Sequence, residues 1–175
     1  MPVTPELAND TSALHLYSDA LGRFGRLNLP PCGLRLRKSQ TTKMMDVYDE
    51  LRRTWVALTP EEWVRQHFVH YMVTTLGFSA LRIANEVPLK LNNTSRRADT
   101  VVYDDFLHPI MVVEYKAPEI AMTKKVLEQA LLYNFEFNAP AIMITNGLDV
   151  VSVLGDKAWR GVITAEKIDS YLIDS

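Results

Sequence analysis

The clearest periodic pattern lies in the middle of the chain, where apolar residues recur at helical spacing. A helix is predicted to begin after Thr59, which suits the N-cap position, with Pro60 at the first helical position and Gly77 closing the end. Its apolar positions are expected to share one face, which carries Val64, Phe68, Met72 and Leu76.

Two neighbouring acidic residues open this predicted helix. By the same spacing, Glu61 is expected on the apolar face, one turn before Val64. Glu62 is expected toward the edge of that face, where completing a capping box with Thr59 accounts for it. A carboxylate on an apolar face is unusual, so Glu61 is a candidate for a functional role.

Shorter apolar runs predict strands on both sides of this helix. The expected strands are residues 33–38, 55–58, 81–91 (interrupted at Pro88), 97–103, 110–116, 141–145 and 149–154. Further helices are predicted over residues 123–137 and 164–173. The sequence therefore predicts a mixed α/β fold: a hairpin of residues 97–103 and 110–116, then a strand–helix–strand unit with a parallel pair.

Length and composition bound the organisation of the chain. The 175 residues predict one domain, residues 27–175, preceded by an N-terminal extension of unknown structure, residues 1–26, which shows no sustained period. No apolar run approaches the about 20 residues of a membrane helix, and no secretory signal is visible. With the single cysteine, Cys32, this predicts a reduced cytoplasmic setting and no membrane.

The charge balance alone does not indicate a nucleic-acid protein, because the formal net charge is −2. Basic residues do cluster locally, and local patches matter more than the total. These clusters are Arg35, Arg37, Lys38 and Lys43; Arg52 and Arg53; Arg96 and Arg97; and Lys124 and Lys125. His67 and His70 are three residues apart on the predicted helix and are interpreted as ordinary helix-surface histidines rather than zinc ligands.

Candidate chemistry lies on the two strands of the predicted hairpin. Glu114 and Lys116 are two residues apart and share a face of their strand. If Tyr103 pairs with Ile110, Asp99 lies opposite Glu114; a shift of two residues would keep the face but separate the pair.

Two facing carboxylates repel each other, and a divalent cation between them removes the penalty. Mg²⁺ prefers oxygen ligands, here Asp99, Glu114 and the backbone carbonyl of Tyr115, and Mn²⁺ is expected to substitute for it. Lys116 beside them is placed to orient or deprotonate water and to face a phosphate, which phosphodiester hydrolysis requires. The alternative is that these are solvated charges at strand ends.

Gln129 and Tyr133 are four residues apart on one face of the helix that follows. They either reach back toward Lys116 or DNA, or form a half-buried polar pair.

Several segments resemble the PD-(D/E)xK nucleases, and most closely the N-terminal nuclease domain of type I restriction enzyme R subunits and their short stand-alone relatives. The segments are RRADTVVYD, VVEYKAPE and EQALLYNF, together with LNLPP and LTPEEWVRQHFVHY, and the likeness covers residues 27–154. The resemblance implies the restriction-endonuclease-like αβββαβ core, with a mixed central sheet flanked by helices.

The resemblance also implies roles for residues of this chain. Asp99 matches the metal-binding Asp, Glu114 and Lys116 match the ExK pair, and Gln129 and Tyr133 match the QxxxY motif. Glu61 resembles the acidic residue of the first helix, a further metal ligand. The R subunits are long motors, whereas these 175 residues contain no GxxxxGK[ST] loop, so ATP-driven translocation is not expected from them.

The main hypothesis is a Mg²⁺-dependent endodeoxyribonuclease that acts on DNA, alone or with restriction-modification or other defence subunits. Two alternatives stay open at this point. One is a catalytically inactive module that binds DNA or a partner on the same fold. The other is an interaction domain of a defence complex without DNA contact.

Overall fold

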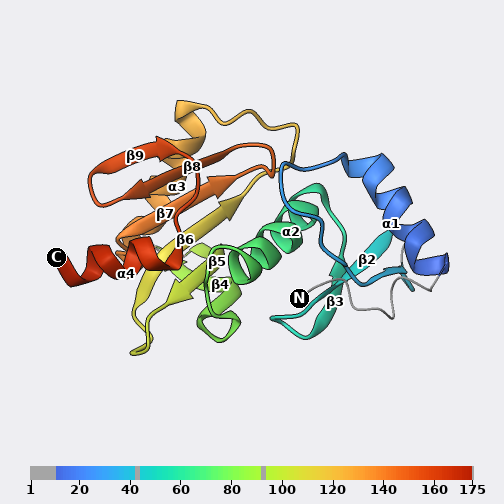
Figure 1. Cartoon of the computed structure of the whole chain (residues 1–175), viewed down its shortest axis with the longest axis horizontal. Helices are drawn as coiled ribbons and strands as arrows, with labels where there is room; N and C mark the ends of the chain where they lie inside the picture. Colours follow the sequence, from blue (N-terminus) through green and yellow to red (C-terminus); the bar gives the residue numbers. More distant parts are fainter. Residues whose placement is uncertain (1–10, 42–43, 92–93, 175) are drawn as a thin grey trace.

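The computed structural model describes residues 11–41, 44–91 and 94–174; within them, the side chains of residues 11, 89–91, 94–96, 129–130 and 132–136 are not described. The elements, in chain order, are α1 Thr11–Phe24, β1 Leu36–Lys38, β2 Met45–Asp49, β3 Thr54–Ala57, α2 Pro60–Thr74, a 3₁₀ turn Ala80–Arg82, β4 Ile83–Leu91, β5 Thr94–Tyr103, β6 Pro109–Tyr115, α3 Lys124–Phe137, β7 Ala141–Thr145, β8 Val150–Leu154, β9 Lys157–Arg160 and α4 Ala165–Asp174 (Figure 1).

A six-stranded mixed sheet forms the centre of the molecule. Its strand order is β4-β5-β6-β7-β8-β9, with β6 and β7 parallel and every other pair antiparallel. Helix α3 connects the parallel pair, as the strand–helix–strand pattern predicted. The expected mixed α/β class with a mixed central sheet is therefore confirmed, with β9 as a strand that the sequence pattern did not reveal.

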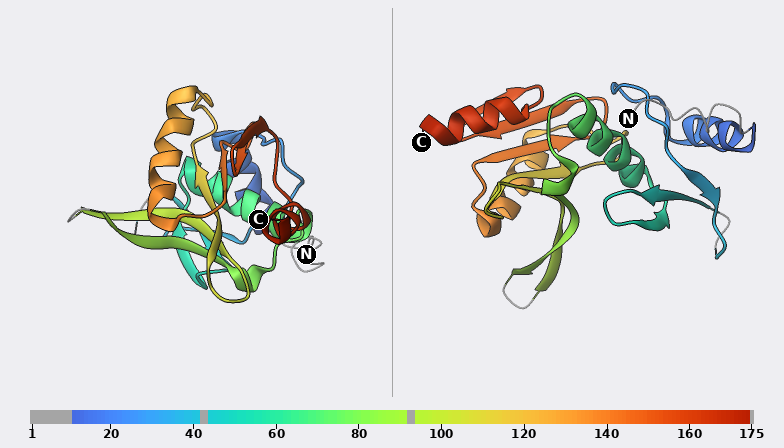
Figure 2. Two further views of the ribbon diagram at one scale, coloured as in Figure 1. Left: turned by 90° about the vertical axis from the view of Figure 1, so that its left-hand side faces the viewer. Right: turned by 60° about the horizontal axis from the view of Figure 1, so that its bottom comes forward.

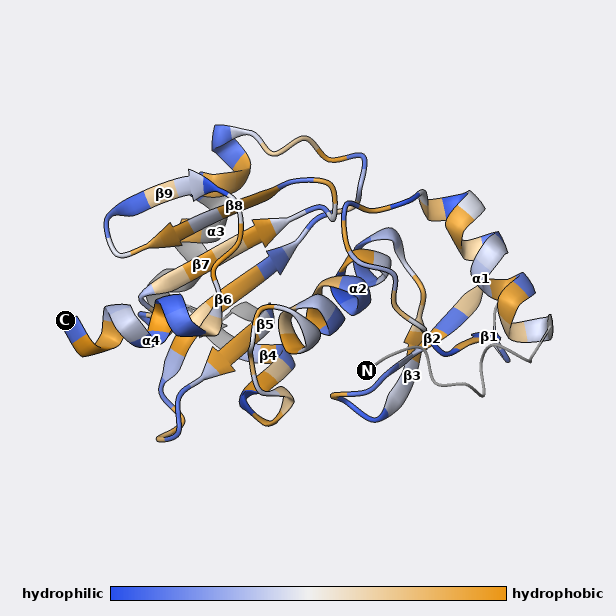
Figure 3. Ribbon diagram, viewed as in Figure 1, coloured by the Kyte–Doolittle hydropathy of each residue, from blue (hydrophilic) through white to orange (hydrophobic). Residues whose placement is uncertain are grey.

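Helices cover both faces of this sheet. Figure 1 shows α2 and α4 on one face and α3 on the other. The main core lies on the first side, where Phe68 of α2 and Ile168 of α4 are fully buried against Met143 of β7. On the second side, Ile142 and Ile144 of β7 pack against α3. Figure 3 shows the apolar residues concentrated on the central strands, as a sheet covered on both faces requires.

Strands β4 and β5 continue past the body of the sheet as a two-stranded arm (Figure 2). Their pairing extends to Leu91 opposite Thr94, whereas the last pair between β5 and β6 is Thr100 with Val113. The expected interruption at Pro88 is wrong, because Pro88 pairs with Arg97 within β4. β4 is an edge strand, so a residue without an N–H on its free side breaks no ladder.

The N-terminal region contains more structure than its sequence pattern indicated. Residues 11–24 form α1, whose Ala20 and Phe24 are buried in the main core, with the Phe24 ring stacked on Trp63. Part of the N-terminal extension, whose structure the sequence did not predict, is therefore a helix that packs on the core. The pattern was obscured because several of the remaining positions of α1 are exposed or half-buried.

A small antiparallel sheet, β1-β2-β3, lies beside α1 and α2 (Figure 1). The strands expected at residues 33–38 and 55–58 are present in shorter or shifted form, and β2 was not predicted. Among the described residues no helix is long and apolar enough to span a bilayer.

Candidate active site

Asp99, Glu114 and Lys116 meet where β5 and β6 part. The register of these strands confirms the expected alignment over Thr100–Val102, and continuing it by one residue puts Asp99 opposite Glu114. The assumed pairing of Tyr103 with Ile110 is wrong, since a bulge between Val102 and Tyr103 pairs Tyr103 with Pro109. The bulge lies at the loop end of the hairpin, so the alignment near Asp99 is unaffected.

Asp99 sits at the end of the strand ladder and is bound from two sides. Its Oδ2 accepts a hydrogen bond from the backbone N–H of Tyr115 at 2.9 Å, so the side chain closes the gap between β5 and β6. Its Oδ1 accepts a bond of 2.7 Å from Nη2 of Arg65, on α2. The side chain of Asp99 remains 23% exposed, so these two partners do not enclose it fully.

Glu114 and Lys116 project from the same face of the chain, as their spacing predicted. The Lys116 ammonium donates to Oε1 of Glu114 at 2.9 Å, and both side chains are largely buried. Burial raises the pKa of Glu114, and so does the Asp99 carboxylate; the Lys116 hydrogen bond and the Lys116 and Arg65 charges act in the opposite direction. The Asp99 carboxylate therefore acts electrostatically on Glu114, which the strand register places opposite it.

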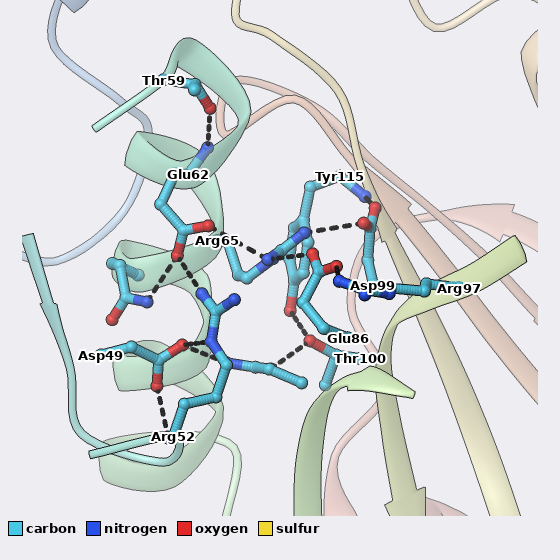
Figure 4. A network of polar contacts seen from close by, with 12 residues as sticks. Asp49, Arg52, Thr59, Glu62, Arg65, Glu86, Arg97, Asp99, Thr100 and Tyr115 are labelled. Atoms are coloured by element: carbon cyan, nitrogen blue, oxygen red, sulfur yellow. Dashed lines mark hydrogen bonds and ion pairs between the residues drawn. The ribbon is translucent and has the colours of Figure 1, made fainter. Parts of the chain in front are cut away.

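Arg65 is the hub of the polar network that joins α2 to the sheet (Figure 4). Its Nη1 lies 3.0 Å from Glu62 and 2.6 Å from Glu86, while its Nη2 binds Asp99. The residue is 5% exposed, and its Nε is the single buried side-chain polar atom of the described part that lacks a hydrogen-bond partner. Burial alone would lower the pKa of Arg65, but the three carboxylates raise it, so the guanidinium stays charged.

The acidic residue of α2 that faces this network is Glu62, not Glu61. Glu61 is exposed, whereas Glu62 is 7% exposed and is bonded by Arg52, Arg65 and Gln66. The expectation that Glu61 lies on the apolar face is therefore wrong. The physical reason is that α2 is buried on nearly all sides over Glu62–Val69, so it has no single apolar stripe from which a phase can be read.

Glu86 adds an acidic residue that the sequence did not single out. It faces Asp99 from β4, between the pairs Asn85–Thr100 and Val87–Ala98, and its own backbone has a φ of +56°. A left-handed residue other than glycine within a strand costs about 1–3 kcal/mol and persists where its surroundings fix it. Here the fixing contacts are the ion pairs of its carboxylate with Arg65 at 2.6 Å and Arg97 at 3.5 Å.

Further hydrogen bonds extend this network from Arg52 to Asp49, Asn85 and Thr100. Asp49 accepts from the backbone and guanidinium of Arg52 and from Asn85, and Asn85 in turn accepts from Thr100. Burial would raise the pKa of Asp49, but these hydrogen bonds and the Arg52 charge outweigh it and lower the pKa. Asp49 therefore stays ionised and holds Arg52 against Glu62.

The donor set at the end of β6 fits a hard divalent cation. Asp99 and Glu114 supply two neighbouring carboxylates, and the backbone carbonyl of Tyr115 directly follows Glu114 in sequence. Among the described residues no three His, Cys, Asp or Glu side chains are spaced to hold a metal. Two carboxylates and a carbonyl suit Mg²⁺, which keeps several waters in its coordination shell.

The part of the chain that holds this arrangement matches a known protein family. Residues 60–165 match the family described as the type I restriction enzyme R protein N terminus (HSDR_N). The chain belongs to this family. The match begins at the first residue of α2 and ends at the start of α4, so it contains Glu62, Arg65, Glu86, Asp99, Glu114 and Lys116.

A solved structure supports the fold of this HSDR_N member. The chain is similar to a fragment of a protein assigned as an HsdR subunit of a type I restriction enzyme from Vibrio vulnificus YJ016, with a TM-score of 0.54 and 16% identity over 67% of this chain. The chain spans 26% of that fragment. A protein from Anabaena variabilis ATCC 29413, assigned as a nuclease of DUF820, matches with a TM-score of 0.41 and 11% identity over 75% of this chain and 93% of its own. No curated protein matches.

Two further residues of the HSDR_N resemblance, Gln129 and Tyr133, lie within α3 at helical spacing, which places them on one face of that helix. Their side chains lie outside the described part of the structure, so their predicted role stays a prediction.

The prediction that His67 lies on the helix surface is wrong. Its side chain is buried, with 4% exposed, and is bonded to the Trp63 carbonyl and the Tyr17 hydroxyl.

Proposed function

We propose that this HSDR_N chain is a Mg²⁺-dependent endodeoxyribonuclease that hydrolyses phosphodiester bonds of DNA at the end of β6. The observation that carries the proposal is the meeting of Asp99, Glu114 and Lys116, in which the two carboxylates repel each other and the amine lies 2.9 Å from one of them. Charges on largely buried strands lose hydration, and their ion pairs with Arg65 and Lys116, or a bound cation, offset that cost.

Each residue has a defined part in this proposal. Asp99, Glu114 and the Tyr115 carbonyl hold the Mg²⁺ ion, and Mn²⁺ can substitute for it. Bound there, the ion supplies polarisation of the phosphate and activation of water. Lys116 positions that water and offsets charge that develops on the phosphate, and its bond to Glu114 keeps the amine in place when DNA is absent.

DNA is expected to approach along the arm formed by β4 and β5. Asp99 and Glu86 lie at the root of this arm, where β5 leaves β6 (Figure 2). Arg97, two residues before Asp99 and 66% exposed, offers a cation to a phosphate beside the scissile bond. Gln129 and Tyr133 are proposed to support the site from α3. Restriction-modification or other defence subunits are the proposed partners, in a reducing cytoplasmic setting.

A plasmid-nicking assay with Mg²⁺ tests the proposal. We expect the wild type to nick supercoiled DNA, and Asp99→Asn and Lys116→Ala to lose this activity. Asp105→Asn is the matched control, because Asp105 is an exposed aspartate on the loop between β5 and β6 that pairs with Arg82. The proposal fails if Asp99→Asn and Lys116→Ala nick as fast as the control.

One observation favours a second function, a binding module without catalysis. In this structure both carboxylates already have protein cations as partners, Arg65 for Asp99 and Lys116 for Glu114. A Mn²⁺ titration separates the two functions, since a cation that binds the folded state raises its melting temperature. No shift with Mn²⁺, together with retained DNA affinity in a gel shift, would favour the binding module.

A further inference from the structure

We propose that Arg65 and Glu86 are positioning residues that hold Asp99 in the orientation required to bind the cation. This inference rests on the proposed function, because it concerns the same metal site. Neither residue touches the metal in the proposal: Arg65 acts on Asp99, and Glu86 acts on Arg65.

The first step concerns the freedom of Asp99. The pairing of β5 with β6 ends at Thr100, so the backbone at Asp99 is no longer held by β6. The orientation of its carboxylate is set instead by two hydrogen bonds from different elements, Tyr115 N–H on Oδ2 and Arg65 Nη2 on Oδ1. Removing the guanidinium leaves one bond, about which the carboxylate can turn.

The second step concerns the aim of Arg65. Its Nη1 is held between Glu62 on α2 and Glu86 on β4, at 3.0 and 2.6 Å. A planar guanidinium fixed at Nη1 from two sides has little rotational freedom, so Nη2 is directed at Asp99 (Figure 4). A lysine keeps the charge but cannot make these three contacts in a fixed plane.

The third step explains the unusual backbone of Glu86. A residue in β4 opposite Asp99 would normally continue the ladder, but Glu86 has a φ of +56° and lies between paired neighbours. The departure from strand geometry accompanies the ion pairs of its carboxylate with Arg65 and Arg97. A left-handed residue other than glycine that is held by its surroundings is typical of functional sites.

The test measures Mn²⁺ affinity by calorimetry on the full chain, alongside thermal unfolding and nicking at a series of Mg²⁺ concentrations. The variants are Arg65→Lys, Glu86→Gln and the double variant. Arg37→Lys is the matched control, because Arg37 also pairs with an aspartate, Asp46, at 3.1 Å but belongs to the small sheet. We expect each single variant to bind Mn²⁺ about 10-fold to 100-fold more weakly, as loss of an outer-shell partner does.

The double variant tests whether Glu86 acts on Asp99 through Arg65. If Glu86 acts through Arg65, adding Glu86→Gln to Arg65→Lys weakens Mn²⁺ binding no further, whereas independent roles would give multiplied effects. Nicking by the variants is expected to recover at high Mg²⁺, because the reacting groups are intact. A purely structural role would lower the melting temperature without changing Mn²⁺ affinity.

The outcomes separate this inference from the function on which it rests. Folded Arg65→Lys and Glu86→Gln that bind Mn²⁺ like the wild type overturn the inference and leave the nuclease proposal standing. A wild type that binds no Mn²⁺ overturns both. If Arg65→Lys does not fold, Glu86→Gln decides alone, since Glu86 is 26% exposed and glutamine keeps its size.

Discussion

The ammonium of Lys116, the first residue after β6, is bonded to Oε1 of Glu114 near the end of that strand rather than pointing into solvent. The bond holds the amine beside the carboxylate that is proposed to bind the cation. Lys116 and Glu114 therefore have separable roles, because the amine cannot itself be a ligand of Mg²⁺ while it is protonated.

This separation predicts a difference between two variants. Lys116→Ala is expected to nick DNA about 100-fold to 10,000-fold more slowly while it still binds Mn²⁺, as for loss of a group that positions or moves a proton. Glu114→Gln is expected to lose both nicking and Mn²⁺ binding, because a ligand is removed. Calorimetry at pH 8 and single-turnover nicking provide the two measurements. Equal loss of Mn²⁺ binding in the two variants would contradict the assigned roles.

Arg97 provides a prediction about DNA binding without catalysis. Arg97→Gln is expected to weaken DNA affinity uniformly across sequences and to reduce the slope of log K against log salt by about 1, as for loss of one phosphate contact. The measurement is a fluorescence-anisotropy titration without Mg²⁺ at several salt concentrations. Arg23→Gln is the control, since Arg23 is exposed on α1, outside the arm formed by β4 and β5. An unchanged slope for Arg97→Gln would show that DNA does not bind along the arm formed by β4 and β5.

The docking of α1 predicts a stability effect from a region outside the family match. Phe24→Ala is expected to lower the free energy of unfolding by about 3 kcal/mol, because Phe24 is buried and stacked on Trp63 with ring centroids 5.8 Å apart. Leu14→Ala on the same helix is expected to change it by less than about 0.5 kcal/mol, since Leu14 is 57% exposed. Urea unfolding measures both. Similar values for the two variants would mean that α1 does not dock in solution.

Period-2 spacing made the centre of the site predictable. Glu114 and Lys116 share a face because side chains alternate along a strand, and the alignment of Asp99 follows from a short hairpin loop. The bulge at Tyr103 was not visible, because it depends on how the loop closes and not on the apolar pattern. The overall α/β class followed from the same local periods.

The surroundings of the site were not predictable in the same way. Arg65 meets Glu86 and Asp99 across 21 and 34 residues of sequence, and no local pattern encodes such contacts. The confusion of Glu61 with Glu62 arose from helix α2, which is enclosed between the large sheet on one side and α1 with the small sheet on the other. Several buried positions of α2 are polar, so the apolar pattern does not mark which side of the helix is buried; these positions are Glu62, Arg65, Gln66 and His67.

The same enclosure gives His67 a predictable effect on stability. Its Nδ1 lies 2.8 Å from the Trp63 carbonyl, which requires a donor, so Nε2 accepts from the Tyr17 hydroxyl at 3.2 Å and the ring is neutral. Burial lowers the pKa of His67 from 6.5 to about 4, with the His70 charge acting in the same direction and the bond to Trp63 against it.

A pKa that is lower in the folded state than in the unfolded state means that the unfolded chain binds the proton first. The contribution of neutral His67 is therefore fully present above pH 6.5 and is lost as the pH falls toward 4. Between pH 7.5 and pH 5.0 this group alone is expected to lower the free energy of unfolding by about 2 kcal/mol. Urea unfolding of the wild type, His67→Gln and the control His15→Gln, whose histidine is exposed, measures the difference. The His67→Gln variant should lose this part of the pH dependence, whereas His15→Gln should keep it. If the free energy of unfolding of His67→Gln falls with pH as steeply as that of His15→Gln, His67 is not buried in its neutral form in the folded chain.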